Sequence, residues 1–290
     1  MTDKDEEEGP AARRRREIQT LERKVGATEV IYSRGRPARI TVPARRFIDR
    51  GEELFRYAPT VTGARLTHLA PELIPDLVAC PHLARLTRLY LGENAIGTEG
   101  VRAIVSSKHL SGLTHLGLGW NRVGTVGAFA LASSEYLVRL TRLDLLDNGI
   151  DSVGALAIAR CAHLSRLTHL DLSLNRIGPA GAHAIAKSKY MRNLTHLSLS
   201  LNRIGPGGAW AIARSEQLTN LTHLDLRGAG LGEQEYAVIR RELLSRRDAI
   251  PGMPGGTQAG DLGCAADESR REEHEQASAT PEDRRSTPEP

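Results

Sequence analysis

Leucines recur along the chain within a unit of fixed length. The unit LTHLDLSLNRIG, residues 167–178, alternates apolar and polar residues over its first half, which is typical of a half-buried β-strand. Near-copies begin every 27 residues, at Leu86, Leu113, Leu140, Leu167, Leu194 and Leu221. The rest of each unit is rich in alanine and predicts a helix. A strand and a helix therefore alternate six times over residues 86–247.

The units also mark where each helix begins. Counting the first leucine as position 1, position 12 is Gly or Asp and position 13 is Thr, Ser or Pro in the first five units. These residues favour a turn followed by the first helical residue. A glycine at position 15, such as Gly181, leaves no side chain on the first helical turn. This predicts close packing of that turn against a neighbouring coil.

Position 9 is asparagine in five units: Asn94, Asn121, Asn148, Asn175 and Asn202. It follows the strand, where the chain turns inward and buried backbone groups need hydrogen-bond partners. An amide side chain both donates and accepts. We therefore expect these asparagines to form a structural ladder between coils.

The combined pattern resembles the ribonuclease-inhibitor-like class of leucine-rich repeats, whose motif LxxLxLxxNxLG before a helix is matched by five units. The resemblance implies an α/β fold, a right-handed leucine-rich repeat solenoid or horseshoe with parallel strands on the concave face and helices on the convex face. The flanking segment SRGRPARITVPARRFIDRGEELFRYAP is similar to that between the repeats and an N-terminal companion domain in paralogue-rich bacterial repeat proteins. The companion domain is not visible here, and whether the chain is a shortened paralogue stays open.

The domain organisation follows from this pattern and from the segments around it. LTHLA, residues 66–70, predicts the strand of a shortened first repeat that begins 20 residues before Leu86, and a strand and an amphipathic helix precede it. The sixth repeat has Ala229 at position 9 and a charged helix, as expected of a terminal cap. The predicted parts are a charged, mostly disordered segment (1–37), an N-terminal cap with the shortened repeat (38–85), six 27-residue repeats of which the last is the C-terminal cap (86–247), and a disordered acidic tail (248–290).

Charge and cysteine content narrow the class of protein. The net charge is +4, but the last 43 residues carry ten acidic and four basic side chains, so residues 1–247 sit near +10. The run of four arginines, 13–16, has no interleaved aromatic residue, which favours a solvated segment over a nucleic-acid site. Cys80, Cys161 and Cys264 lack metal-ligand spacing, and no apolar run resembles a signal or a membrane span. We expect a cytoplasmic protein.

Parallel strands place equivalent positions in columns on the concave face. Position 3 gives a basic column that includes Arg88, His115, Arg142 and His169, followed by His196 and His223. Position 5 gives an acidic column that includes Asp144, Asp171 and Asp225. The histidines could hold a metal or sense pH, but repeat duplication favours a solvated face.

Large apolar residues at the strand ends are the second candidate feature. Trp120, Leu146, Leu174 and Leu201 predict one apolar strip for a partner, with packing against their own loops as the alternative. A further column on the helices is expected to pack between adjacent helices: Phe129, Leu156, His183 and Trp210.

The sequence has none of the motifs of phosphate, dinucleotide or zinc sites. We therefore expect a non-enzymatic, monomeric scaffold that binds a partner protein on the concave sheet, with no cofactor, metal, membrane or nucleic acid. The alternative is a regulator of a GTPase or other enzyme, by analogy with GTPase-activating proteins built on leucine-rich repeats. A catalytic Arg or Asn in a loop that breaks the 27-residue period would favour it.

Overall fold

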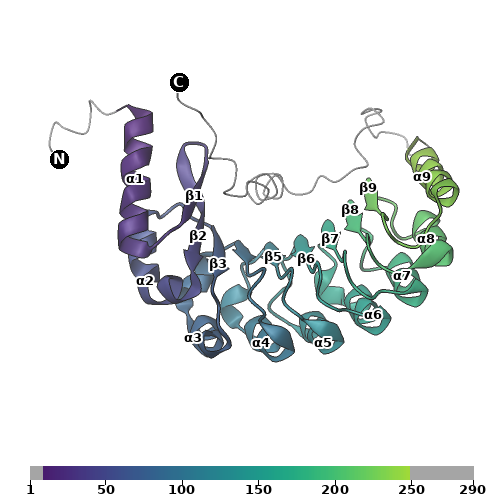
Figure 1. Cartoon of the computed structure of the whole chain (residues 1–290), viewed down its shortest axis with the longest axis horizontal. Helices are drawn as coiled ribbons and strands as arrows, with labels where there is room; N and C mark the ends of the chain where they lie inside the picture. The colour runs from purple at the N-terminus through teal and green to yellow at the C-terminus, as the bar shows by residue number, and fades with distance from the viewer. Residues whose placement is uncertain (1–8, 249–290) are drawn as a thin grey trace, which may run out of the picture. The chain divides into compact units, whose positions relative to one another are not determined.

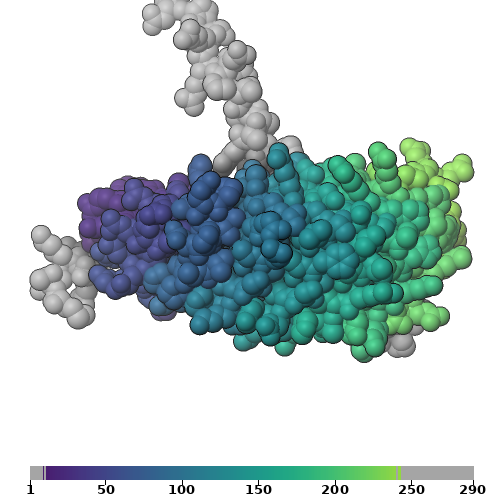
Figure 2. Space-filling view, turned by 90° about the horizontal axis from the view of Figure 1, so that it is seen from below, coloured from purple at the N-terminus to yellow at the C-terminus, as the bar shows by residue number. Residues whose placement is uncertain are grey.

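The computed structural model describes residues 9–248; residues 1–8 and 249–290 lie outside the described part, and with them almost all of the predicted acidic tail. The described strands form one sheet in the order β1-β2-β3-β4-β5-β6-β7-β8-β9. They line the inner side of a curved stack whose helices lie outside (Figure 1). Figure 2 shows the stack from below, with the coils following one another in chain order. The predicted α/β solenoid is confirmed.

Each repeat contributes a short strand. The repeat strands are β4 (Arg88–Tyr90), β5 (His115–Gly117), β6 (Arg142–Asp144), β7 (His169–Asp171), β8 (His196–Ser198) and β9 (His223–Asp225). Neighbouring strands pair in parallel, with residues 27 apart opposite one another, as in the pair Arg142 and His169. The repeat therefore sets the register of the sheet.

The repeat helices begin where the sequence predicts. They are α4 (Gly97–Val105), α5 (Gly124–Ser133), α6 (Ser152–Arg160), α7 (Pro179–Ala186), α8 (Gly205–Ala213) and α9 (Glu233–Asp248). A Cβ atom at Gly181 would lie 3.0 Å from the Cα of Ser152, so this first turn does press on the preceding coil. Ile158, Ile185 and Ile212 are buried beneath the strands' leucines and complete the core.

The N-terminal cap comprises α1 (Pro10–Val25), β1 (Glu29–Ser33), β2 (Arg36–Pro43), α2 (Ala44–Tyr57), β3 (Gly63–Thr67) and α3 (Ile74–Ala79). The prediction of disorder over residues 1–37 is wrong for the described residues from 9 onward. Leu21 and Val25 of α1 are buried in the common core, and β1 pairs with β2 in antiparallel register. Charged residues dominate the exposed side of α1. The average composition of the segment is therefore strongly charged, and it does not indicate the apolar side that packs in the core.

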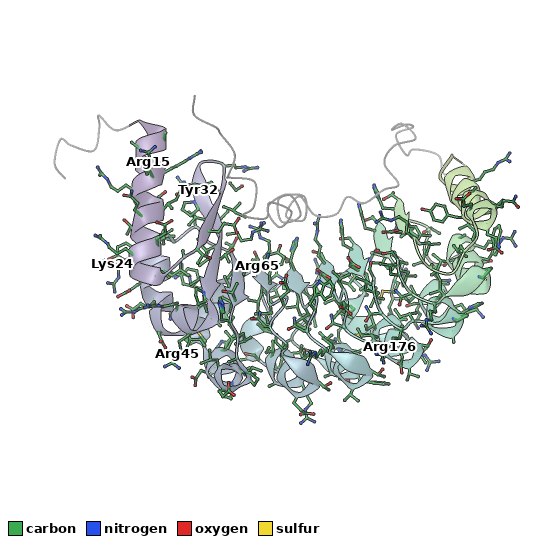
Figure 3. All side chains as sticks on the ribbon, in the orientation of Figure 1. Arg15, Lys24, Tyr32, Arg45, Arg65 and Arg176 are labelled. Carbon is green, nitrogen blue, oxygen red and sulfur yellow. The ribbon has the colours of Figure 1, made fainter. Side chains whose placement is uncertain are left out.

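A polar contact also fixes α1 to the β1–β2 hairpin. The Tyr32 hydroxyl donates to the Glu17 carboxylate at 3.1 Å, and the Arg14 guanidinium lies 5.3 Å from the Tyr32 ring centre. Burial and the Glu17 charge raise the pKa of Tyr32 to about 12. Figure 3 labels Tyr32 on the hairpin and Arg15 on the adjacent helix.

The first repeat has a different register from the one predicted. Gly63 pairs with Arg88 and Arg65 with Tyr90, so the offset to the next strand is 25 residues. The predicted start at Leu66 is therefore wrong by five residues: the unit begins at Val61, and its strand is Gly63–Thr67 rather than LTHLA. Leu66 is therefore at position 6 of its coil and His68 is at position 8, just after the strand, whereas a start at Leu66 would have placed His68 at position 3 beside Arg88. His68 has φ 53°, as residues at position 8 of later coils also do.

No helix in the described range is both long and apolar enough to span a membrane.

Candidate protein-binding surface

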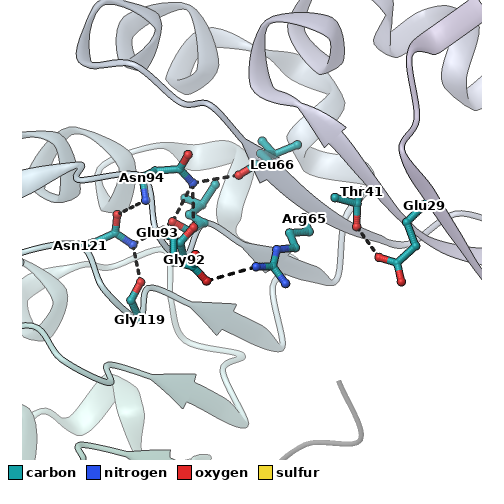
Figure 4. Close-up of polar contacts among 10 residues, drawn as sticks. Glu29, Thr41, Arg65, Leu66, Gly92, Glu93, Asn94, Gly119 and Asn121 are labelled. Atoms are coloured by element: carbon teal, nitrogen blue, oxygen red, sulfur yellow. Dashed lines mark hydrogen bonds and ion pairs between the residues drawn. The ribbon is translucent and has the colours of Figure 1, made fainter. Parts of the chain in front are cut away.

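The asparagines at position 9 link each coil to the next. The Asn121 side chain donates to the carbonyls of Leu91 (2.8 Å) and Leu118 (3.0 Å), and its oxygen accepts from the backbone N–H of Asn94 and of Ile96, both at 3.2 Å. Figure 4 shows the start of this ladder at Asn94 and Asn121. The same pattern repeats through Asn148, Asn175 and Asn202. These side chains hold the loops at the strand ends.

The residue before each asparagine faces outward. Position 8 has a left-handed backbone in every repeat, with φ between 46° and 65°, and its residues are Glu93, Trp120, Asp147, Leu174, Leu201 and Gly228. This conformation costs a residue with a side chain about 1–2 kcal/mol. Trp120, Leu174 and Leu201 are nonetheless 49%, 36% and 54% exposed. Large apolar groups thus occupy a strained, solvent-facing position that Gly228 fills without strain.

The predicted apolar strip is not continuous. Leu146 stands at position 7, is half-buried and lies beside Gly119 of the preceding coil. Asp147 takes position 8 of that repeat, between Trp120 and Leu174. Asp147 therefore divides the exposed apolar residues into two groups. Trp120 lies on one side of it, and the adjacent residues Leu174 and Leu201 lie on the other.

The aspartates of the concave face have structural partners. One Asp171 oxygen accepts from the backbone N–H of Ser173 at 2.9 Å, and Asp144 does the same for Leu146 at 3.0 Å. Asp225 is 9% exposed and is held by Arg227 through two bonds of 2.9 and 2.8 Å. Burial opposes the charge of Asp225, but the hydrogen bonds and the charge of Arg227 outweigh it and lower its pKa. The acidic column therefore shapes the strand ends as well as charging the face.

Each histidine of the column is held by the threonine before it. The Thr168 hydroxyl lies 3.0 Å from the Thr141 carbonyl and 2.9 Å from His169 Nδ1. The same arrangement holds at Thr114, Thr195 and Thr222 for the histidines that follow them. Nδ1 of each ring is thus engaged with a neighbouring hydroxyl group, which fixes the orientation of the ring.

Three of these rings are stacked. His169 and His196 lie with their centres 4.0 Å apart, as do His196 and His223. Burial, followed by repulsion from neighbouring cationic groups, lowers the pKa of His169 and of His196 to about 4. Stacked, nearly parallel rings do not turn their nitrogens toward a common point, so the three cannot converge on one ion. Within the described residues, no group of three or more His, Cys, Asp or Glu is placed to hold a metal.

The arginines of the basic column differ in exposure. Arg142 is exposed between His115 and His169, whereas Arg88 is half-buried. The Arg88 Nε is buried and has no hydrogen-bond partner among the described residues. The column therefore carries charge at Arg88 and Arg142, whereas the lowered pKa values leave the His169 and His196 rings uncharged near neutral pH.

The column on the helices behaves only partly as predicted. Leu156 and Trp210 are half-buried, and Arg214 lies 4.4 Å from the Trp210 ring centre. Phe129 is 45% exposed and His183 is exposed, so the prediction that they pack between helices is wrong. With Val126 and Val153, Phe129 leaves apolar groups on the outside of α5 and α6.

Comparison with known proteins identifies the repeats. Five segments match the family model described as Leucine Rich repeat: residues 82–105, 109–132, 140–159, 163–186 and 190–213. The chain therefore contains leucine-rich repeats. The structure is also similar to that of Leiomodin-1 Actin-Binding Site 2, with 20% sequence identity, coverage of 53% of this chain and 79% of that chain, and a TM-score of 0.33. A comparison with curated proteins finds no match.

Proposed function

We propose that this protein is a binding scaffold that holds a partner protein against its concave sheet and the adjoining strand ends. The observation that carries the proposal is the exposure of Trp120, Leu174 and Leu201 in a left-handed backbone. Neither core packing nor backbone conformation requires a large apolar side chain there. A few exposed aromatic and aliphatic groups supply much of the affinity in protein interfaces.

The sheet beside these anchors supports the same proposal. Arg88 and Arg142 supply positive charge, His115 lies beside Arg142 in the same column, and the lowered pKa leaves the His169 ring uncharged near neutral pH. Asp144 and Asp171 add negative charge one column away. Ordered charges of this kind orient a partner and set its rate of association more than they set the affinity. Within this scheme Asp225 acts mainly by holding Arg227.

No specific observation among the described residues favours the alternative, a regulator of a GTPase or other enzyme. From β4 to β9 the strands keep the 27-residue register, so the described repeats contain no inserted loop with a catalytic Arg or Asn. We therefore retain the scaffold as the proposed function.

The test is affinity capture from a native lysate with the full chain. In the site variant, Trp120, Leu174 and Leu201 are replaced by glycine, the residue that repeat six has at this position. The matched control replaces Val126, Phe129 and Val153, which are 60%, 45% and 51% exposed on the helices, by serine. We expect the site variant to lose a discrete set of captured proteins that the control retains. Loss of the same proteins from both variants, or from neither, would refute the proposal.

A further inference from the structure

Three of the repeats carry an arginine two residues after the exposed apolar group. The pairs are Trp120 with Arg122, Leu174 with Arg176, and Leu201 with Arg203. In the other three repeats, position 8 is Glu93, Asp147 or Gly228 and position 10 is Ala95, Gly149 or Gly230. Arginine is thus found at position 10 only where position 8 is large and apolar.

The loop geometry places both members of a pair on the outside. In the fourth repeat, Leu174 and Arg176 are exposed, and the Asn175 between them is buried in the ladder. The ladder therefore fixes the backbone between the two exposed side chains. In Figure 3 the Arg176 label lies over the helix layer, near α6 and α7.

These arginines have no partner of opposite charge in the described chain. Among the side chains that the structure describes, those of Arg122, Arg176 and Arg203 form no ion pair or hydrogen bond with another residue. Some other exposed arginines are paired, as Arg102 is with Glu99 at 2.6 Å and Arg227 is with Asp225 at 2.8 Å. A guanidinium group is well suited to bind a carboxylate through two parallel hydrogen bonds.

We propose that the strand-end rim formed by these three pairs selects an acidic partner segment, in which carboxylates alternate with large apolar side chains. The apolar groups would pack on Trp120, Leu174 and Leu201, and the carboxylates would meet the adjacent arginines. The inference rests on the proposed function, since it uses the same apolar anchors, but it adds residues and a partner class that the concave columns do not define.

The rim has a stronger and a weaker half. Repeats four and five are neighbours, and their strands β7 and β8 pair directly, so Arg176 and Arg203 follow adjacent strands. Repeat three lies between these and Arg122, and it presents Asp147. A like charge facing the partner's carboxylates opposes binding. The principal contact is therefore at Leu174, Arg176, Leu201 and Arg203.

The probe is a display library of random peptides selected on the full chain. We expect enriched peptides to combine Asp or Glu with Leu, Phe or Trp, and their affinity to fall as sodium chloride is added. Replacing Arg122, Arg176 and Arg203 by glutamine should weaken an enriched peptide by about 10–100-fold, since hydrogen bonds to charged groups are strong contacts. Asp147→Asn should strengthen it by about 2–5-fold, because a repulsive charge is removed without changing the shape.

The matched control uses arginines at the other ends of the strands. Arg139, Arg166 and Arg192 are exposed and precede the strand leucines, and replacing them by glutamine removes the same total charge. This control should leave the affinity within about 2-fold of the parent, because surface charges beyond a Debye length are screened. Equal weakening by both sets would show attraction by net charge alone and would overturn the inference.

The remaining outcomes separate this inference from the proposed function. If the glycine variant of Trp120, Leu174 and Leu201 abolishes peptide binding but the arginine variant does not, the acidic selectivity fails and the apolar binding site stands. If neither variant weakens binding, both proposals fail at this surface. Failure to enrich peptides, enrichment without acidic residues, or tighter binding of a random oligonucleotide through the same arginines would each overturn the inference.

Discussion

The asparagine at position 9 and the residues on either side of it lie in the same loop, but they differ in burial and in how often they recur between repeats. Asn175 is buried and hydrogen-bonded, and the residue at its position is asparagine in four other repeats. Leu174 and Arg176 are exposed, and their counterparts differ from repeat to repeat. Every coil must satisfy the same backbone groups, so the residue that does so recurs. The comparison teaches that repetition marks structural roles in this chain, whereas departures from repetition mark candidates for binding.

Replacing the central asparagine should have the largest effect on stability. The Asn175 side chain takes part in five hydrogen bonds, including acceptance from the backbone N–H groups of Asn148 and Ile150. At about 1 kcal/mol for each bond, with buried groups left unpaired, Asn175→Ala should lower the free energy of unfolding by about 3–5 kcal/mol. Urea denaturation measures it. Arg176→Ala, the adjacent control, should change it by less than about 0.5 kcal/mol. Similar costs for the two variants would remove the comparison.

The N-terminal segment is an exception to this rule. Residues of α1 lie outside the repeats and do not recur, yet some of them are structural. Leu21 of α1 is 1% exposed and belongs to the core. Leu21→Ala should lower the free energy of unfolding by about 2–4 kcal/mol, since it removes buried methyl groups and leaves a cavity. Gln19→Ala, on the exposed side of the same helix, is the control. If Leu21→Ala is as mild as the control, α1 is dispensable, as its charged composition suggests.

This contrast explains how much the sequence predicts. The period of 27 determines the strand register and the helix starts from β4 onward because each unit repeats the same hydrogen bonds and packing. The start of the first repeat is predicted five residues late, since LTHLA imitates a repeat start while Gly63 and Ala64 take the strand positions. Helix α1 is ordered because it packs against α2. The period of the repeats cannot predict this packing, since α1 lies outside them.

The binding surface is predictable in part for the same reason. The apolar residues Trp120, Leu174 and Leu201 depart visibly from their column, so inspection of the repeats finds them. Their left-handed backbone and the unpaired state of Arg122 within the described residues depend on loop geometry. The signal that could have found the arginines is their coincidence with the apolar residues two positions earlier.

The histidine column is intermediate between the buried, recurring asparagines and the exposed, variable binding residues, because its residues recur but are only half-buried. His169 and His196 have pKa values of about 4 instead of 6.5, because burial, followed by nearby cationic groups, disfavours the charged rings. As the pH falls, these histidines are therefore protonated in the unfolded chain at a higher pH than in the folded chain. The stability that this contributes is fully present above pH about 6.5 and is lost as the pH falls towards about 4.

The expected loss between about pH 7 and about pH 4.5 is about 1–2 kcal/mol, reduced by solvent screening of the half-exposed rings. Denaturation at the two pH values measures it, and His169→Gln with His196→Gln should remove most of that difference. His163→Gln, at an exposed histidine outside the stack, should leave the pH dependence as in the parent. If the double variant keeps the full pH dependence, the stack is not its source.

The smallest change in stability should come from the exposed apolar position itself, and it should have the opposite sign. Leu174 has φ 55°, which costs a leucine about 1–2 kcal/mol, whereas glycine adopts this conformation freely and loses about 0.5–1 kcal/mol through chain entropy. Leu174→Gly should therefore leave stability unchanged or raise it by up to about 1 kcal/mol. Val126→Gly, at an exposed helical residue, should lower it by about 0.3–0.5 kcal/mol. Thermal unfolding of both variants, together with binding of a selected peptide, decides the matter. Increased stability combined with lost binding is the result expected of a residue kept for recognition, and a clear loss of stability would show instead that Leu174 is needed for packing.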